Sequence, residues 1–247
     1  MIIATSITEE YLEKSKPFFE SANKHFEGEK ICFCIGFICQ IEGWDVVYVP
    51  IEGLKCKWQP KNRKNYYSLQ HGEFVEWYNF KDNETILFVD SDMILQRPFD
   101  IALDFKETDF YTTDSSFPAT LLQDAAINLN VKAPIDFFDK FNITSDSSEE
   151  EFCAAWMTAS VKNWKKLFKL TKSNYLEFLS YFEHHAAWQL LINYTIINYF
   201  RYKKLAPNIQ NAIWYSGTSA QIKNDTLFYQ DKTVYFNHTK FNGNWKY

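Results

Sequence analysis

The sequence has little glycine and little proline, with 7 residues of each among 247. Collagen-like and low-complexity disordered chains are rich in these two residues, so the composition excludes both classes. No stretch approaches the ~20 consecutive apolar residues of a membrane-spanning helix. The opening residues, MIIATSITEEYLEKS, lack the basic segment and cleavage site of a signal peptide. We therefore expect a cytoplasmic protein without a membrane span, for which peripheral membrane association stays possible.

Basic residues are outnumbered by acidic ones, and the formal net charge is -5. This balance argues against a protein that binds nucleic acid non-specifically. Three of the five cysteines, Cys32, Cys34 and Cys39, lie in the apolar run ICFCIGFICQ. We interpret them as small buried hydrophobic side chains in a reducing compartment rather than as a metal site.

Strand-like and helix-like segments alternate along the first half of the chain. We expect strands at 2–7, in KICFCIGF, in DVVYVPI, in ETILFVD, at 109–114 and in FCAAWMTASV, and helices around 11–26, over 62–79, from Asn163 and over about 174–200. This alternation predicts one α/β domain over 1–247, with a mostly parallel central sheet and helices on both sides.

The most informative stretch is ETILFVDSDMILQRPFD, from Glu84 to Asp100. A continuous apolar run, typical of a strand covered on both faces, ends in Asp90-Ser91-Asp92. Ligands of parallel sheets bind at the carboxyl ends of strands, and the extended chain would point both carboxylates the same way. Such a pair can hold a divalent cation. An exposed acidic turn is the weaker interpretation, because Met93 and two further apolar residues follow directly.

Two metal-carboxylate chemistries use an Asp-x-Asp pair after a strand. Phosphatases of the haloacid-dehalogenase type use the first Asp as a nucleophile, but their motif usually lies near the N-terminus and continues differently. Glycosyltransferases with the GT-A fold place the pair on a strand in the middle of the chain, as here.

Four segments together resemble the GT-A glycosyltransferases, most of all the family-eight, glycogenin-like group. They are YYSLQHGEFVEWYNFKDNETILFVDSDMIL, EFCAAWMTASVKNWKKL, WQLLIN and YFNHTKFNGNW. Their order and spacing agree with that family over most of the chain. The resemblance implies a single Rossmann-like GT-A domain, with a nucleotide-binding half over 1–100 and an acceptor-binding half with a C-terminal lid over 101–247.

The sequence departs from the family at three places, and in its closing segment Gly243 and Lys246 are only roughly in register with the family's pattern. The family's Asn-Ala-Gly is Cys153-Ala154-Ala155, and its Asp-Gln is Trp188-Gln189. An arginine that the family carries before the Asp pair would fall near Ser68. Arg63 and Lys64 lie about one helical turn earlier and are the candidates to replace it.

The resemblance implies a metal site formed by Asp90, Asp92 and His238. Two carboxylates, an imidazole and diphosphate oxygens favour Mn²⁺ over Mg²⁺. The bound ion would neutralise the diphosphate leaving group of a nucleotide sugar. Asp92 would bind the ion directly, and Asp90 would share it or hold the ribose. The remaining donor-binding candidates are Ala4, Thr5 and Ser6 on the first strand, Arg63, Lys64, Ser91, Ala154, Ala155, Gly243, Trp245 and Lys246.

The stereochemistry of transfer stays open from the residues alone. An inverting enzyme needs a carboxylate base, for which Asp114, Glu151 and Glu183 are undistinguished candidates. A retaining enzyme of the resembled kind keeps a glutamine near the donor, and Gln189 occupies that place, so retention is favoured.

The sequence thus predicts a hexosyltransferase that uses a nucleoside-diphosphate sugar, expected to be a UDP-sugar, and a glycan or glycolipid acceptor. A sugar-phosphate nucleotidyltransferase is an alternative, although ATSITEEY lacks the glycine-rich phosphate loop that it needs. A catalytically silent nucleotide- or glycan-binding module is the third possibility.

Overall fold

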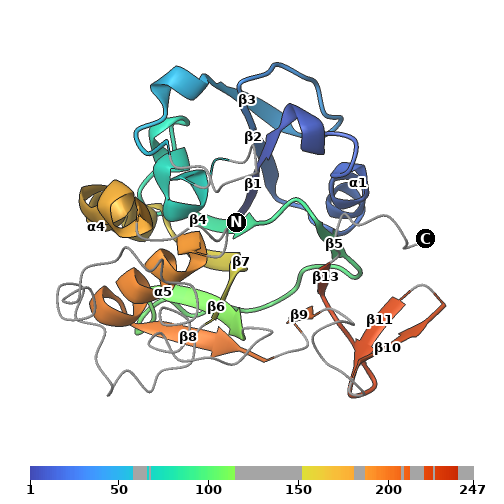
Figure 1. The fold of residues 1–247 in the computed structure, drawn as a ribbon. Helices are drawn as coiled ribbons and strands as arrows, with labels where there is room; N and C mark the ends of the chain where they lie inside the picture. The colour runs from blue at the N-terminus through green and yellow to red at the C-terminus, as the bar shows by residue number, and fades with distance from the viewer. Residues whose placement is uncertain are drawn as a thin grey trace.

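The structure is a computed structural model of the chain, shown in Figure 1. It describes residues 1–57, 66, 68–114, 152–180, 187–206, 209–211, 220–224 and 226–238.

A seven-stranded sheet forms the centre of the molecule. Its strands are β1 (Ile2–Thr8), β2 (Glu29–Ile35), β3 (Asp45–Val49), β4 (Thr85–Val89), β6 (Phe110–Asp114), β7 (Phe152–Ser160) and β8 (Tyr202–Leu205). They lie in the order β3-β2-β1-β4-β7-β6-β8. Every neighbouring pair is parallel except the two that include β7, which runs against β4 and β6. The predicted mostly parallel sheet is confirmed.

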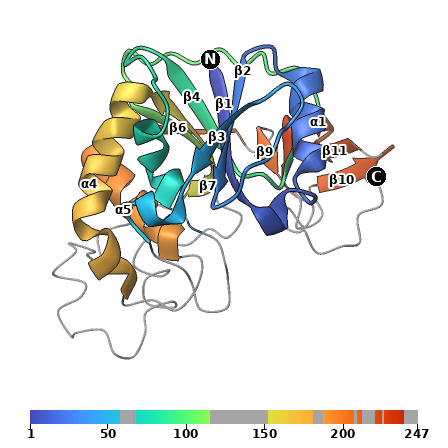
Figure 2. The same ribbon diagram turned by 90° about the horizontal axis from the view of Figure 1, so that it is seen from above.

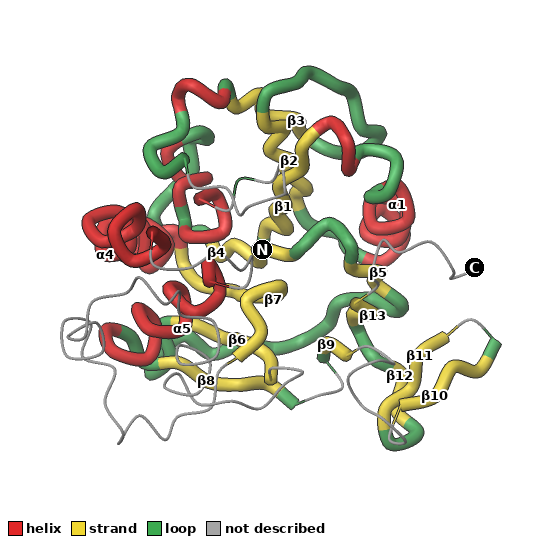
Figure 3. The backbone as a smooth tube through the Cα atoms, in the orientation of Figure 1, coloured by secondary structure: helices red, strands yellow, loops and turns green. Residues whose placement is uncertain are grey.

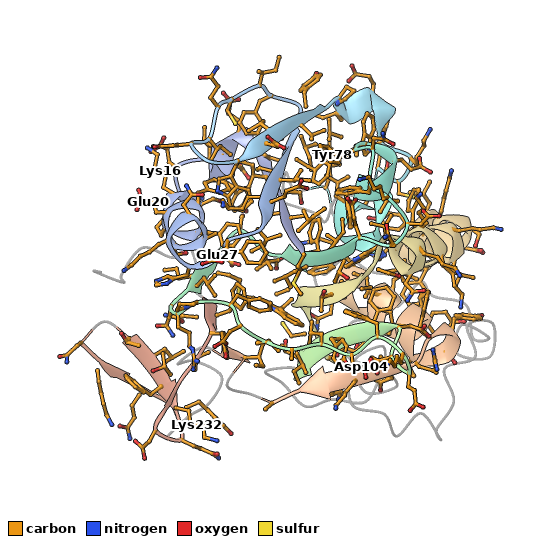
Figure 4. All side chains as sticks on the ribbon, turned by 180° about the vertical axis from the view of Figure 1, so that it is seen from behind. Lys16, Glu20, Glu27, Tyr78, Asp104 and Lys232 are labelled. Atoms are coloured by element: carbon orange, nitrogen blue, oxygen red, sulfur yellow. The ribbon has the colours of Figure 1, made fainter. Side chains whose placement is uncertain are left out.

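Helices cover both faces of this sheet, as Figure 2 shows. Helix α1 (Lys16–His25) lies on one face, and α4 (Val161–Ser180) and α5 (Ala187–Tyr199) lie on the other. Alternate residues of each central strand point to opposite faces. One buried cluster therefore joins Ala4 and Phe88 with Trp164 of α4, whereas a second joins Ile3 with Phe18 of α1. The side chains drawn in Figure 4 fill both layers.

Two small sheets follow the central one. In the first, β5 (Met93–Leu95) pairs with β13 (Phe236–His238), which also pairs with β9 (Gln210–Asn211). The second is a meander of β10 (Ala220–Lys223), β11 (Thr226–Tyr229) and β12 (Lys232–Thr233). Figure 3 shows β5 and β13 side by side beyond the end of the central sheet. The end of the chain is thereby brought next to residues that directly follow the Asp pair.

Most of the expected elements are confirmed, but the helix expected over 62–79 is wrong. The described part of this segment contains two short 3₁₀ helices, η3 (Ser68–His71) and η4 (Glu73–Glu76). Gly72 separates them with φ 94°, in the left-handed region that favours glycine. A Cβ at Gly72 would lie 2.7 Å from the backbone oxygen of Trp164. The helix is interrupted because the chain turns here against α4. Two further 3₁₀ turns are η1 (Glu9–Tyr11) and η2 (Ile51–Gly53).

The cysteines are reduced, and Cys39 is the only one of the five that is not fully buried. Their interpretation as core side chains agrees with this burial. None of the helices in the described ranges is long and apolar enough to cross a membrane.

We predict that Gly72→Ala destabilises the fold more than Gly36→Ala. Both glycines have positive φ, 94° and 77°, so both changes carry the left-handed strain of about 1–2 kcal/mol. At Gly36 the new Cβ meets the flexible end of Ile51, whereas at Gly72 it meets backbone. We expect a loss of about 2–4 kcal/mol for Gly72→Ala from urea unfolding. Equal losses for the two variants would contradict a close-packed η3–α4 contact.

Candidate active site

The candidate site lies where the strand order of the central sheet reverses. The β1–β4 ladder ends at the Ala4–Phe88 pair, whereas the β1–β2 ladder continues to Thr8 and Ile35. The strands β1 and β4 therefore stop pairing at their carboxyl ends. This is the topological switch point at which ligands bind to open α/β sheets.

Asp90 leaves β4 at this point and starts a tight turn. Its backbone N–H donates to the carbonyl of Ala155 at 2.9 Å, which extends the β4–β7 ladder by one residue. The N–H of Met93 then donates to the carbonyl of Asp90 at 3.2 Å. The extended backbone expected across Asp90-Ser91-Asp92 is therefore wrong: the three residues form a turn, because the chain passes here from the central sheet to β5. Ser91 is 9% exposed.

The carboxylate of Asp90 is held by a residue that sequence reasoning missed. The Nε2 amide of Gln70, in η3, donates to Oδ1 of Asp90 at 2.5 Å. Gln70 is buried, and it reaches the Asp pair from 20 residues upstream. Asp92 is partly exposed, but its Oδ1 is buried. No spacing rule links a glutamine in a 3₁₀ turn to a strand end, so only the resemblance of the whole segment pointed toward this region.

Gln189 lies near the start of α5, on the face of the central sheet that α4 and α5 cover. Its Oε1 accepts a hydrogen bond from the N–H of Ala154 at 3.3 Å. One turn later, Asn193 accepts from the N–H of Phe152 at 2.8 Å and donates to its carbonyl at 3.1 Å. Ala154 is followed by Ala155, the backbone partner of Asp90. Gln189 and the Asp90 turn are therefore both hydrogen-bonded to neighbouring residues of β7. The i, i+4 spacing of Gln189 and Asn193 was the available sequence signal for the second residue.

His238 is brought to the same turn by the small sheet. In the antiparallel β5–β13 ladder, His238 is opposite Met93, the residue that directly follows Asp92. The side chain of His238 lies outside the described atoms. Over the described residues, no three side chains of His, Cys, Asp or Glu are grouped to hold a metal ion. The role of His238 as a metal ligand stays a prediction.

The structure describes some of the other predicted site residues and leaves the rest outside the described ranges. On β1, Ala4 and Thr5 are fully buried, and Ser6 is partly exposed. Because side chains alternate along a strand, Ser6 lies on the same face of the sheet as Ala4. Phe88, which pairs with Ala4, lies on that face too, and so does Asp90, two positions beyond Phe88. Arg63, Lys64, Gly243, Trp245 and Lys246 lie outside the described residues, as do Glu151 and Glu183, and Asp114 is described only as the last residue of β6.

Two ionisable residues beside Gln70 are buried in the same segment. His71 is fully buried, its ring packs edge-on against Tyr175 at 4.8 Å, and burial lowers its pKa to about 3. Neither ring nitrogen has a hydrogen-bond partner within the described part of the chain. Burial raises the pKa of Glu73, although its carboxylate accepts a hydrogen bond from the N–H of Lys55 at 2.5 Å. Both residues are thus enclosed in the core beside Gln70.

Comparisons with known proteins place this fold. No protein-family model matches the chain, and a search of curated proteins finds no match. Among solved structures, the galactosyltransferase LgtC in complex with donor and acceptor sugar analogs matches with a TM-score of 0.60 and 13% identity. An active-site glutamine-to-glutamate mutant of LgtC matches with a TM-score of 0.62 and 12% identity. Each match covers 96% of this chain and 86% of the other.

The chain therefore has the GT-A fold, and the fold is similar to that of LgtC, a family-eight enzyme. The fold class and the resemblance inferred from the sequence are confirmed. The division into a nucleotide-binding half and an acceptor-binding half stays a prediction.

The buried imidazole of His71 predicts a loss of stability in mild acid. Its folded-state pKa of about 3 lies below its ordinary value of 6.5. As the pH falls below 6.5, the unfolded chain binds a proton there and the folded chain does not, so the free energy of unfolding decreases. The decrease due to this residue is about 2 kcal/mol at pH 5.

His71→Leu should remove this part of the acid limb in urea unfolding measured between pH 7 and pH 5. His25→Gln is the matched control, because His25 is partly exposed and its pKa is lowered to a lesser extent, by burial and by Lys24. If the His71→Leu protein keeps the wild-type pH dependence, the imidazole is not the group that is protonated on unfolding.

Proposed function

We propose that this protein is a metal-dependent glycosyltransferase. It transfers a sugar from a nucleoside-diphosphate sugar, with UDP as the expected nucleotide, to a glycan or glycolipid acceptor. We propose retention of the anomeric configuration and residence in the cytoplasm. The fold of the solved relatives supports the class, and the residues at the switch point support the chemistry.

One observation carries the proposal: the turn Asp90-Ser91-Asp92 lies at the carboxyl end of β4, and the ladder brings His238 opposite the next residue. Two carboxylates and an imidazole are a suitable donor set for Mn²⁺, and hard carboxylate oxygens also suit Mg²⁺. These residues fit a divalent ion, and Asp90, Asp92 and His238 would hold it. Such an ion neutralises the negative charge that develops on a diphosphate leaving group.

The chain's own residues would bind and orient the donor. Gln70 donates a hydrogen bond to Oδ1 of Asp90 and would hold this carboxylate in a fixed orientation. Ser6 and Ser91 are small residues beside the turn, where a ribose can approach closely. Ala4 and Thr5 would act by shaping β1, since their side chains are enclosed. The predicted roles of Arg63, Lys64, Ala154, Ala155, Gly243, Trp245 and Lys246 in donor binding remain part of the proposal.

Gln189 is the proposed polar group on the reacting face of the donor sugar. Its Oε1 is engaged by the N–H of Ala154, which orients the amide so that Nε2 is the donor group at the other end. The solved LgtC structures include an active-site mutant in which a glutamine is replaced by glutamate. A glutamine at the active site of a protein with this fold supports the assignment of Gln189.

A silent binding module is the second candidate, and one observation favours it. Trp188 occupies the position of the family's donor-contacting aspartate, and it is 7% exposed and packed in the core. A carboxylate is thus replaced by a core side chain. Release of UDP from a panel of UDP-sugars separates the candidates: a transferase turns over, a silent module binds without turnover, and a nucleotidyltransferase requires a nucleoside triphosphate and a sugar phosphate.

Asp92→Asn should keep the fold, because the side chains have nearly the same shape, and lose at least about 10²-fold in transfer rate. Gln70→Leu should lose about 10-fold, because Asp90 loses its orienting partner. Sugar transfer from the active member of the UDP-sugar panel gives both rates. The matched control is Asp82→Asn, which removes the same charge from an exposed residue that pairs with Lys165.

The control should transfer sugar at the wild-type rate. The metal assignment is wrong if Asp92→Asn transfers at that rate while the reaction still needs the metal ion.

UDP should bind much more tightly in the presence of Mn²⁺ than in EDTA, because the ion would bridge protein carboxylates and the diphosphate. Isothermal titration calorimetry measures both affinities. His238→Ala should reduce the difference, whereas His25→Ala, which removes a partly exposed imidazole from α1, should leave it unchanged. Equal affinities with and without Mn²⁺ would favour the silent module.

A further inference from the structure

Helix α4 carries a stripe of lysines on the face that points away from the sheet. The opposite face is formed by buried apolar residues, among them Trp164 and Leu167. The stripe consists of Lys162, Lys165, Lys166, Lys169 and Lys172, and all five are exposed. At 100° per residue they fall within about 120° of the helix circumference. The helix therefore has one apolar face and one strongly basic face.

The net charge of the surface around this stripe is positive, whereas the net charge of the whole protein is negative. Arg201, which pairs with Asp109, adds a sixth cationic group, and Lys166 also lies within electrostatic range of Asp109. Among the described residues, the acidic groups paired with these cations are Asp109 and Asp82, the latter with Lys165 at 2.7 Å, and α4 itself carries Glu177. These six cationic and three acidic groups of the described residues sum to +3, on a chain whose net charge is -5.

Exposed apolar side chains accompany the lysines. Leu176 is 57% exposed and lies on the same helical face, one turn beyond Lys172. Tyr199, at the end of α5, is 49% exposed, and its carbonyl accepts a hydrogen bond from Nζ of Lys166 at 3.0 Å. Nζ of Lys166 also lies 4.3 Å from the ring centroid of Phe200. The lysine stems thus cover apolar surface while their charged ends remain near solvent.

We propose that the basic face of α4 docks the protein on an anionic membrane surface. Basic and apolar side chains combined on one helical face are typical of helices that lie in a membrane interface. From Lys162 to Leu176 the stripe is about 21 Å long, enough to contact several lipid headgroups. A long nucleic acid fits less well, because the remainder of the chain is acidic and would repel it. The proposal goes beyond the proposed function and does not depend on it.

Among the described elements, none covers this face, since all five lysines are exposed. Figure 2 shows α4 along the outer edge of the molecule, with α1 at the opposite edge. The meander of β10–β12 also lies far from α4 in both Figure 1 and Figure 2. A membrane along α4 would therefore contact this helix and the end of α5 without covering the other face of the sheet.

Flotation with lipid vesicles tests the proposal and needs no sugar donor. Vesicles are made of phosphatidylcholine alone or of phosphatidylcholine with phosphatidylglycerol. We expect binding only to the anionic vesicles, and weaker binding as the salt concentration increases. Each lysine near an anionic surface contributes about fivefold in affinity, so the triple variant Lys162→Gln/Lys169→Gln/Lys172→Gln should bind about 100-fold more weakly. Leu176→Gln should weaken binding by about tenfold.

The matched control is Lys24→Gln/Lys106→Gln/Lys232→Gln, which removes the same charge from exposed residues elsewhere. Lys232 is labelled in Figure 4, on the side of the molecule away from α4. The control should bind as the wild type does. Absence of binding to anionic vesicles, equal losses in the two triple variants, or tighter binding to a DNA duplex than to vesicles would overturn the proposal. Wild-type binding by Leu176→Gln would overturn insertion of the apolar side chain.

Discussion

The backbone hydrogen bond from Asp90 to Ala155 is the contact on which the site depends. It is the last rung between β4 and β7, and it fixes the position at which the chain leaves the central sheet. The following turn directs the chain into β5, and β5 in turn pairs with the C-terminal strand β13. The strands β5 and β13, separated by more than 140 residues, therefore meet beside the Asp pair because β4 ends directly before Asp90.

Desolvation explains why a polar shell surrounds this turn. The last four residues of the strand before Asp90 are buried, and a carboxylate at its end must regain the interactions that water supplied. Gln70 provides one charge-assisted hydrogen bond to Asp90, and it is held in place by a segment whose own polar groups are buried. Burial of that segment disfavours charge on its side chains. It lowers the pKa of His71 and raises the pKa of Glu73, so the neutral form of each is favoured.

The sequence predicted the central sheet well and the irregular parts poorly, for physical reasons. Continuous apolar runs such as ETILFVD are covered on both faces, so their local pattern is sufficient to identify them. The segment before β4 has an apolar pattern that also suits a helix, but the close contact of Gly72 with Trp164 is a tertiary constraint that no local pattern reveals. The turn at Asp90 was likewise missed, because it arises from a change of sheet. The predicted role of His238 rests on the family resemblance alone, since the position of this residue depends on pairing with a strand far away in the sequence.

Helix α4 connects the candidate active site with the proposed membrane-docking face. The backbone of Trp164 meets Gly72, which positions the turn that carries Gln70, and the opposite face of the same helix bears the lysine stripe. A rigid helix transmits its orientation to whatever packs on it, because close-packed contacts leave little room for independent movement. A membrane that fixes the basic face of α4 would thus also fix the direction in which the Asp90 turn faces. For a glycolipid acceptor, that direction decides whether the headgroup can reach the donor, so docking and transfer would share one structural element.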